Sequence, residues 1–271
     1  MKELKGRVAV VTGAGSGIGQ AAAMALAKEG LQVAVTDLDP VSAERTVALI
    51  VEGEGLARPY ELDVADRTSI GSAAERITGD LGVPSVLVNN AGIGVGGYFL
   101  DTSEESWERV MAVNLMGVVH CCRAFVPAMV QEGAGGHVVN IASMLGYFGG
   151  RGVSAYCATK FGVVGFSECL RAELCDHGVG VSTICPGLVR TNIIKAGVLE
   201  SGTEDVEAKR EIIERIYRKR NYTPNRVARA IVGAIRKNRA LVPVTPEARV
   251  AYYLKRWTPW LAGWIARRDA V

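Results

Sequence analysis

The feature that most constrains the fold is a series of short, continuous apolar runs rich in valine and isoleucine, separated by longer stretches with helical periodicity. Such runs suit strands that are buried on both faces of a parallel sheet. Because parallel strands need crossover connections, the alternation predicts a doubly wound sheet with helices on both faces. The expected strands are RVAVVT (7–12), QVAVTD (32–37), SVLVNNA (85–91), HVVNIAS (137–143) and VGVSTIC (179–185), with two weaker ones at 56–64 and near residue 240.

The stretches between these strands account for most of the remaining chain. No low-complexity tract or linker rich in proline, glycine or serine divides the sequence, and 49% of its residues are hydrophobic. A chain of 271 residues is long enough for one large α/β domain. We therefore expect a single domain over residues 1–271. The expected helices cover residues 18–29, 40–53, 66–79, 103–130, 154–176 and 224–238.

The C-terminal part of the chain differs from the rest. Residues 190–223 lack a sheet-like pattern and are expected to form a substrate lid, which includes the amphipathic stretch EDVEAKREIIERIYRKR. The extension at 245–271 gathers three of the four tryptophans among basic residues. Residues 207–271 contain 16 Lys and Arg against 5 Asp and Glu, a net charge of +11, and the preceding residues carry −8. The extension suits a subunit contact, a pocket wall, or a contact with a membrane surface or another anionic partner; a solvated basic surface explains the charge equally well.

Three further observations bear on the class of protein. The apolar run near the N-terminus is too short for a signal sequence or a membrane span, so we expect a soluble, cytoplasmic protein, and no nucleic-acid partner is expected. The six cysteines contain no C-x-x-C pair and lie in apolar or helical segments, which predicts reduced thiols that pack in the core. The three histidines lack the spacing of a metal site, and no metal is expected.

A glycine-rich segment, TGAGSGIG, follows the first expected strand and precedes an alanine-rich helical stretch. Gly13, Gly17 and Gly19 permit a tight turn and a close approach to phosphate oxygens, and a helix N-terminus supplies free N–H groups. Asp37 ends the second strand at about the spacing expected of a carboxylate that binds the ribose hydroxyls. Because such a carboxylate repels a 2′-phosphate, and because Leu38 rather than arginine follows it, the sequence favours NAD(H) over NADP(H).

Tyr156 and Lys160 lie four residues apart in a stretch with a helical pattern, so their side chains project from one helix face. A phenol with a pKa near 10 is a poor base at neutral pH. A nearby ammonium favours the phenolate and lowers the phenol pKa, which would allow Tyr156 to take or return an alcohol proton. Taken alone, this spacing also suits an exposed surface pair.

Together with NNAG at 89–92, Ser143 at a strand end and PG at 186–187, these motifs resemble the short-chain dehydrogenase/reductase family. The resemblance runs from about residue 5 to residue 195. It implies a Rossmann fold and an NAD-dependent oxidoreductase that acts on the CH–OH group of its substrate. It also implies a homodimer or homotetramer, formed through the two longest expected helices.

The resemblance implies a role for each matching position. Ser143 would hold the substrate oxygen beside the Tyr156 phenol, and Asn114 would anchor a water between Lys160 and solvent; Asn89 is expected to brace neighbouring strands. The implied catalytic residues are thus Asn114, Ser143, Tyr156 and Lys160. The implied cofactor-binding residues are Gly13, Gly15, Ser16, Gly17, Ile18, Gly19, Asp37, Leu38, Asp63 and Val64 beside the adenine, Asn90, Ala91, Gly92, Tyr156, Lys160, Pro186, Gly187, and Val189 and Thr191 at the nicotinamide carboxamide.

The residues expected around the substrate are mostly apolar, with Arg151 the one clear charge, and come from 94–99, 144–153 and the lid. This favours a secondary alcohol or ketone with a hydrophobic body, such as a steroid, a terpenoid, a retinoid-like alcohol or a fatty acyl chain. One alternative is a 3-oxoacyl thioester reductase whose acidic carrier docks on the basic C-terminal region, although Asp37 disfavours the NADPH that such reductases usually take. Another is a dinucleotide-binding protein without turnover. The expected pocket includes Leu145, Tyr147, Phe148, Leu188, Ile193 and Ile194.

Overall fold

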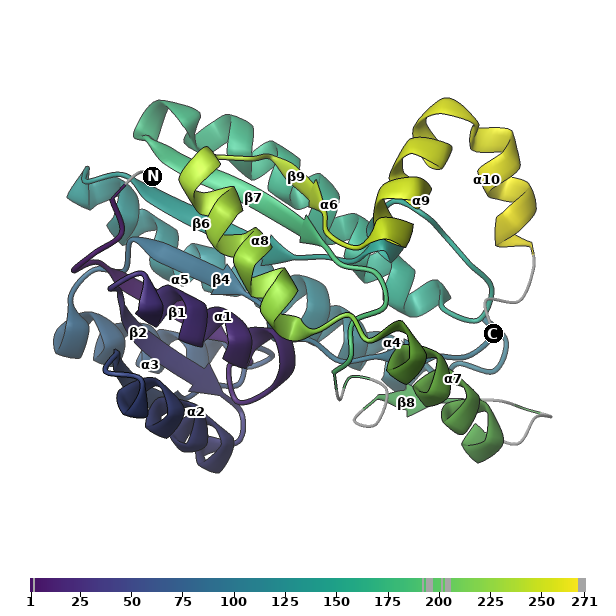
Figure 1. Ribbon diagram of the computed structural model, residues 1–271, viewed down its shortest axis with the longest axis horizontal. Coiled ribbons are helices and arrows are strands. Elements are labelled where there is room, and N and C mark those ends of the chain that lie inside the picture. The colour runs from purple at the N-terminus through teal and green to yellow at the C-terminus, as the bar shows by residue number, and fades with distance from the viewer. Residues whose placement is uncertain (2, 192, 194–196, 201, 203–205, 268–271) are drawn as a thin grey trace.

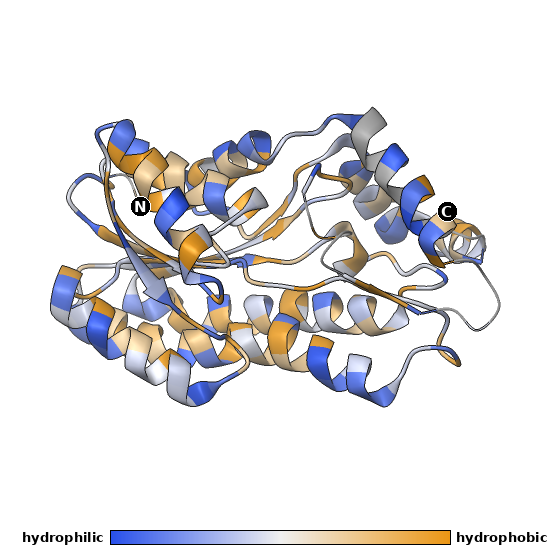
Figure 2. Cartoon of the chain, turned by 90° about the horizontal axis from the view of Figure 1, so that it is seen from below, coloured by the Kyte–Doolittle hydropathy of each residue, from blue (hydrophilic) through white to orange (hydrophobic). Residues whose placement is uncertain are grey.

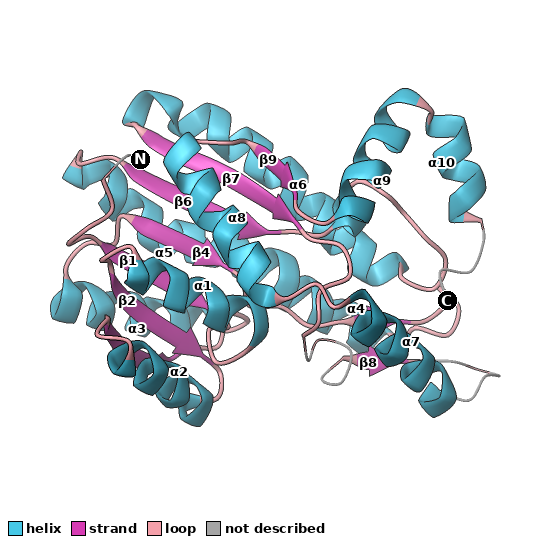
Figure 3. Ribbon diagram, in the orientation of Figure 1, coloured by secondary structure: helices cyan, strands magenta, loops and turns pink. Residues whose placement is uncertain are grey.

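The centre of the molecule is a sheet of seven parallel strands in the order β3-β2-β1-β4-β6-β7-β9, which confirms the predicted α/β, Rossmann-type fold (Figure 3). The computed structural model describes all residues except 2, 192, 194–196, 201, 203–205 and 268–271. The strands are β1 (Val8–Thr12), β2 (Gln32–Asp37), β3 (Leu56–Glu61), β4 (Val86–Asn89), β6 (Gly136–Ile141), β7 (Val179–Cys185) and β9 (Leu241–Pro243).

The strand order reverses at β1, which pairs with β2 on one side and with β4 on the other. Val10, in the middle of β1, lies opposite Ala34 and Leu87 in these two ladders. The chain therefore moves outward to β3 and then returns to start the second half of the sheet at β4. In open α/β sheets, ligands bind at such a switch point, beyond the carboxyl ends of the strands. The segments that follow β1 and β4 meet at this position.

Two layers of helices bury the faces of the sheet (Figure 1). Alternate residues of β1 point to opposite layers, since Ala9 and Val11 belong to one core cluster and Val10 to the other. Figure 2 shows the apolar strands between the two layers, with the hydrophilic residues of the helices turned outward. One layer contains α1 (Gly17–Lys28), α2 (Pro40–Glu52) and α8 (Pro224–Lys237); the other contains α3 (Arg67–Leu81), α5 (Gly117–Glu132) and α6 (Ser154–Leu174).

The prediction of one helix over 103–130 was wrong in one respect. The segment consists of α4 (Glu104–Met111) and α5, joined by a π-helical turn at Ala112–Met116 that carries the fully buried Asn114. Such a turn adds one residue to the helical repeat and is frequent at functional sites. Apolar periodicity did not reveal it, because the residues on both sides keep a helical pattern. By length and composition the whole segment could cross a bilayer, but in α5 Phe125 and Met129 are buried in the core against the sheet.

The segment expected to form a lid contains a strand that its sequence pattern did not predict. β8 (Val198–Leu199) pairs in parallel with β5 (Val95–Gly96), which makes a second, two-stranded sheet. Glu200, directly after β8, accepts hydrogen bonds from the backbone N–H and hydroxyl of Ser103 and from the hydroxyl of Ser106. These contacts attach Glu200, within the segment, to the N-terminal end of α4. The predicted amphipathic helix is present as α7 (Val206–Arg220).

The C-terminal extension forms a hairpin of two helices, α9 (Pro246–Trp257) and α10 (Pro259–Ala266). In Figure 1 it stands away from the body at the end of the molecule toward which the strands point. The Tyr147 hydroxyl donates to the Ala248 carbonyl over 2.6 Å, and its ring packs edge to face against Tyr252. The Arg151 guanidinium donates to the Arg267 carbonyl over 3.2 Å. The hairpin is thus fastened to the loop that follows β6.

Polar side chains brace the centre of the sheet, as expected for Asn89. Its amide nitrogen donates to the Oδ1 atom of Asn140 on the neighbouring strand over 2.8 Å, and Asn140 donates to the Ser167 hydroxyl of α6 over 2.9 Å. All three residues are buried. The expectation for the cysteines was correct for four of them, since Cys121, Cys122, Cys157 and Cys185 are buried. It was wrong for Cys169 and Cys175, which are exposed on the outer side of α6 and just after its end.

Two leucines in helices of the same layer offer a matched test of this core. Leu26 in α1 is fully buried, whereas Leu49 in α2 is 42% exposed. Leu26→Ala leaves a cavity against the sheet and should lower the free energy of unfolding by about 2–5 kcal/mol. Leu49→Ala should lower it by about 1 kcal/mol or less. Urea denaturation followed by circular dichroism measures both, and equal effects would contradict the packing described.

Candidate active site

The glycine-rich segment turns sharply between β1 and α1. Gly13 has a φ of +61°, and a Cβ atom at this position would lie 2.8 Å from the Cα of Ala91. Both the left-handed backbone at this position and the close approach of the segment after β4 therefore require glycine, which has no Cβ atom. The Thr12 hydroxyl accepts from the backbone N–H groups of Asn90 and Ala91, each over 3.0 Å. These contacts place the predicted residues Gly13, Asn90 and Ala91 side by side at the switch point.

The N-terminus of α1 fits a phosphate group. Ser16 is the N-cap residue, but its side chain makes no capping hydrogen bond, and the first turn contains no acidic residue. The first N–H groups of a helix have no partner within the helix, and they carry the positive end of the helix dipole. Gly17 has a φ of +56°, and a Cβ there would lie 3.3 Å from the methyl group of Thr191. The predicted residues Gly15, Ser16, Gly17, Ile18, Gly19 and Thr191 thus border the space that a dinucleotide diphosphate would need.

Asp37 ends β2 at the same edge of the sheet. One of its carboxylate oxygens accepts from the Gly15 N–H over 2.8 Å, and the other accepts from the Asp39 N–H over 3.1 Å. Each oxygen keeps a lone pair for another donor. The following side chain, Leu38, is 64% exposed, and the nearby cation Arg45 lies 3.9 Å from the carboxylate of Asp39. The carboxylate is therefore held in place beside the glycine-rich turn.

Asp63 and Val64 follow β3, at the outer end of the expected cofactor site. Asp63 accepts from the Ala65 N–H over 2.8 Å, and its own N–H donates to the Ser69 hydroxyl over 3.0 Å. Val64 is buried, and a Cβ on Gly117 of α5 would lie 3.0 Å from it. The two residues thus form a short, fixed turn at the edge where β1 and β2 also end.

Lys160 lies in α6, and its side chain is buried beneath Tyr156. Its Nζ atom lies 5.5 Å from the centroid of the Tyr156 ring and donates to the Ile141 carbonyl over 3.0 Å. Burial lowers the pKa of Lys160 to about 8, because removal from water disfavours the ammonium form. The ammonium therefore predominates at pH 7. Lys160 is buried and Tyr156 is partly buried, so the predicted pair is not the exposed surface pair that its spacing also allowed.

Ser143 lies two residues beyond β6, which ends at Ile141, the residue whose carbonyl holds Lys160. It caps the short 3-10 helix Met144–Gly146 and accepts from the Leu145 N–H over 3.1 Å. The Met144 N–H donates to the Pro186 carbonyl over 2.8 Å. This bond joins the Ser143 loop to the predicted Pro186–Gly187 segment.

Asn114 joins the same group of residues from the π-helical turn. Its Oδ1 atom accepts from the Ile93 N–H over 2.8 Å, and its amide nitrogen donates to the Ile93 carbonyl over 2.9 Å. A Cβ on Gly92 would lie 3.2 Å from this Oδ1 atom and 3.7 Å from Lys160 Nζ. The structure therefore brings together Asn114, Lys160 and the end of the NNAG segment, which are far apart in the sequence.

Comparison with known proteins identifies the family. A profile described as short chain dehydrogenase matches residues 7–200. The chain belongs to the short-chain dehydrogenase/reductase family. It is 46% identical over 252 residues to "Probable oxidoreductase EphD" of Mycobacterium tuberculosis, a match that covers 92% of this chain and 43% of that protein. The chain thus spans less than half the length of this relative.

Two other comparisons have a bearing on the site. A 3-oxoacyl-[acyl-carrier-protein] reductase, FabG of Thermotoga maritima, is 37% identical over 191 residues, which cover 69% of this chain and 76% of that protein. A short-chain dehydrogenase/reductase from Burkholderia phymatum, solved in complex with NAD, superimposes with a TM-score of 0.89 at 30% identity and covers 100% of this chain and 99% of its own. The chain therefore belongs to a family of oxidoreductases that use NAD or NADP.

In this short-chain dehydrogenase/reductase, sequence patterns missed several residues that shape the site. Thr245 and Glu247, at the start of α9, hold the segment after β7: the Gly187 N–H donates to the Thr245 hydroxyl over 3.1 Å and the Leu188 N–H to the Glu247 carboxylate over 2.9 Å. No local pattern links residues almost 60 positions apart. Thr12 could have been found, because it is a polar residue at the carboxyl end of a buried strand.

The residues expected around the substrate fall into two groups. Tyr147 is buried beneath α9 with its hydroxyl bonded to Ala248, so it belongs to the core that supports the loop. Ile193 lies against the predicted wall residue Gly94, where an added Cβ would lie 3.1 Å from the Ile193 carbonyl. Leu145, Phe148 and Leu188 are partly buried. Ile194 lies outside the described residues.

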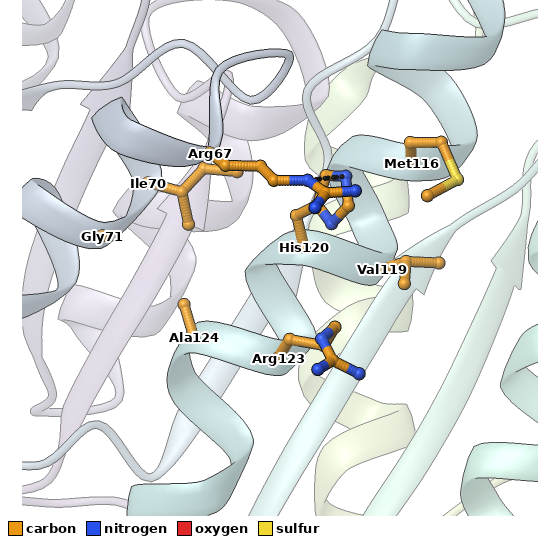
Figure 4. A pocket seen from close by; sticks show the side chains of 8 residues that line it. All are labelled: Arg67, Ile70, Gly71, Met116, Val119, His120, Arg123 and Ala124. Atoms are coloured by element: carbon orange, nitrogen blue, oxygen red, sulfur yellow. Dashed lines mark hydrogen bonds between the residues drawn. The ribbon is translucent and has the colours of Figure 1, made fainter.

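A surface pocket of about 500 Å³ lies apart from these groups, between α3 and α5 (Figure 4). Arg67 donates to His120 across it over 3.2 Å, and Arg123 lines the same pocket. Burial, followed by the two arginine charges, lowers the pKa of His120. None of the predicted catalytic or cofactor-binding residues lines this pocket.

The burial of Lys160 predicts an unusual dependence of stability on pH. Because its pKa is about 8 in the folded state and about 10.5 in the unfolded state, the unfolded state binds more protons between these values, and stability rises with pH. The stability difference between the native protein and Lys160→Met should shift by about 2 kcal/mol in favour of the native protein between pH 7 and pH 9.5. Denaturant titrations of both proteins measure it, and a difference that stays constant with pH would contradict the burial.

Proposed function

We propose that this protein is an NAD(H)-dependent dehydrogenase or reductase that interconverts a hydrophobic secondary alcohol and its ketone. The observation that carries the proposal is the buried ammonium of Lys160 beside the Tyr156 ring, at the sheet edge where the glycine-rich turn and Asp37 also lie. Burial of a cation lowers stability unless the cation is hydrogen-bonded or paired, so a protein that keeps one often needs it for function. Groups with perturbed pKa values are frequent at functional sites.

In this proposal Tyr156 is the acid and base. When bound, NAD(H) would supply the hydride chemistry at the substrate carbon. The residues of the protein would transfer the proton of the substrate oxygen. Lys160 stabilises the phenolate form of Tyr156, so the phenol oxygen takes the alcohol proton during oxidation and returns it during reduction. The Ile141 carbonyl keeps Lys160 in place, since it accepts from the same Nζ atom.

The other two residues orient the reacting groups. Ser143 would bind the substrate oxygen through its hydroxyl and hold it beside Tyr156, a position fixed by the short helix that Ser143 caps. Asn114 would hold a water near Lys160 and so link the site to solvent. Its amide pairs with Ile93 in both directions, which fixes the segment between the cofactor site and Lys160.

The preference for NAD over NADP rests on Asp37. Both carboxylate oxygens are oriented by backbone N–H groups, so that they can accept hydrogen bonds from the two adenosine ribose hydroxyls. A 2′-phosphate would place negative charge next to this carboxylate. Leu38 offers no compensating cation. The Burkholderia phymatum relative, which was solved with NAD, supports the same choice.

Substitution of Asp37 tests the cofactor preference. Asp37→Ala removes the hydrogen bonds to the ribose, which should raise KM for NAD by about 10- to 100-fold, since bonds to a charged group contribute about 1.5–3 kcal/mol. Asp39→Ala removes a neighbouring carboxylate that caps α2, and it should change KM for NAD much less. Initial rates with NAD and with NADP at equal concentration measure the preference. A native protein that prefers NADP would contradict the proposal.

The substrate is proposed to be hydrophobic because the described wall residues are mostly apolar. They include Leu145, Phe148, Leu188 and Ile193, all partly buried around the end of the sheet. An apolar pocket of this kind favours a secondary alcohol or ketone with a steroid-, terpenoid-, retinoid- or fatty-acyl-like body.

A series of secondary alcohols tests both the chemistry and the pocket. We expect kcat/KM with NAD, followed by absorbance of the reduced cofactor, to rise with the apolar size of the alcohol. Tyr156→Phe should lower kcat by about 100- to 10,000-fold with NADH binding retained, because only the proton donor is lost. Tyr253→Phe, on the exposed side of α9, is the matched control. Unchanged turnover in Tyr156→Phe would refute the mechanism, and turnover of small polyols alone would refute the apolar substrate.

A second candidate is the reduction of a 3-oxoacyl thioester. The similarity to the reductase of Thermotoga maritima supports it, and so does the basic C-terminal region, on which an acidic carrier protein could dock. Asp37 argues against it where the reaction uses NADPH. A 3-oxoacyl thioester reduced with NADPH faster than any alcohol is oxidised with NAD would favour this candidate.

A further inference from the structure

The hairpin of α9 and α10 exposes several large apolar side chains. Trp257 is 76% exposed, Trp260 is 74% exposed and Trp264 is 50% exposed. Scattered apolar residues on a surface are ordinary, but a contiguous group of large ones marks an interaction site. Three tryptophans within eight residues form such a group.

Helical spacing places these residues on the outer sides of the hairpin. Val250, Tyr253 and Trp257 follow one another at i, i+3 and i+7 on α9, so they share one face, and all three are exposed. Trp260 and Trp264 lie at i and i+4 on α10. Ala248 in α9 and Ala262 in α10 are the buried residues of the two helices. The hairpin therefore presents these exposed side chains to the outside, while Tyr252 packs against the body of the protein.

Cations surround this apolar surface. Arg249, Lys255, Arg256 and Arg267 are exposed in the described part of the hairpin. The one carboxylate between residues 246 and 267, that of Glu247, accepts from the Leu188 N–H and so faces the body of the protein. Tryptophan suits the boundary between water and lipid, because its ring is apolar and its N–H is polar. Lysine and arginine beside such rings attract anionic headgroups.

We propose that the α9–α10 hairpin is a docking surface for anionic membranes. The charge pattern favours lipid over a second copy of the chain, because a symmetric contact would bring two sets of cations together without carboxylates between them. The apolar side chains would enter the headgroup region while the cations bind lipid phosphates, as in helices that lie in the plane of a membrane surface.

The position of the hairpin connects this surface with the catalytic site. Tyr147 and Arg151 fasten it to the loop after β6, and Glu247 fastens it to the segment after β7. Figure 1 shows it beside the end of the sheet where the strands terminate. Docking would therefore bring the end of the sheet that carries the catalytic residues close to the lipid. The link between docking and the substrate rests on the proposed function. It identifies the substrate class as alcohols and ketones that partition into bilayers.

Vesicle co-sedimentation tests the docking surface directly. The full-length protein should bind vesicles of phosphatidylcholine mixed with phosphatidylglycerol, and it should bind pure phosphatidylcholine much more weakly. Arg249→Gln with Arg256→Gln should lower the partition coefficient on the mixed vesicles by about 25-fold, since each cation contributes about fivefold. Trp257→Ser with Trp260→Ser should lower it by about tenfold or more.

A charge-matched control lies at the opposite end of the molecule. Lys28 and Lys237 end α1 and α8, which run antiparallel to the strands, so both are remote from the hairpin. Lys28→Gln with Lys237→Gln removes two cations and should leave vesicle binding unchanged. Equal loss in this control would show that net charge alone drives binding and would overturn the proposal.

Two further measurements separate the remaining outcomes. Sedimentation velocity without lipid should give the same oligomeric state for the native protein and the tryptophan variant. A different oligomeric state, together with no vesicle binding by the native protein, would show that the hairpin is a contact between copies and would overturn the proposal. Turnover of a water-soluble secondary alcohol should be unchanged in the hairpin variants, which shows that they are folded. Absence of this turnover in the native protein would contradict the proposed function and leave the vesicle result intact.

Discussion

The site depends on a single buried cation. The ammonium of Lys160 donates to the Ile141 carbonyl at the end of β6, and it lies beneath the Tyr156 ring one turn earlier in α6. This arrangement fixes the position of α6 along β6, because a shift of the helix by one residue would separate Nζ of Lys160 from the Ile141 carbonyl. Burial makes the ammonium less stable than in water, and the carbonyl and the aromatic face offset part of that cost. Gly92 lies between this ammonium and the side chain of Asn114, which in turn is bonded to Ile93.

Much of this arrangement could be predicted from the sequence, because it depends on local chemistry. Buried parallel strands are continuous apolar runs, and β2 and β7 begin and end where those runs do. The glycine-rich turn could be predicted because a tight turn between a strand and a helix, close to a phosphate, requires glycine. Asp37 could be predicted because it ends the next strand at the spacing expected of a ribose-binding carboxylate. Tyr156 and Lys160 lie on one helix, so their spacing predicted their proximity.

The remaining features depend on contacts between distant segments, for which the sequence holds no local signal. Thr245 and Glu247 reach the backbone after β7 across almost 60 residues. The two-residue strands β5 and β8 are too short to show an alternating pattern. The π-helical turn at Asn114 changes the register of a helix without changing the types of residue that compose it. The exposure of Cys169 was missed because α6 has apolar residues on more than its buried face.

The contact of α9 with the segment after β7 has a consequence for how such proteins diversify. An independent C-terminal extension could vary while the nucleotide-binding half of the chain stayed constant. Here its first turn holds the backbone of Gly187 and Leu188, next to the residues expected at the nicotinamide. An exchange of this extension between relatives would therefore also alter the backbone segment that is expected at the nicotinamide. The two halves of the chain must change together.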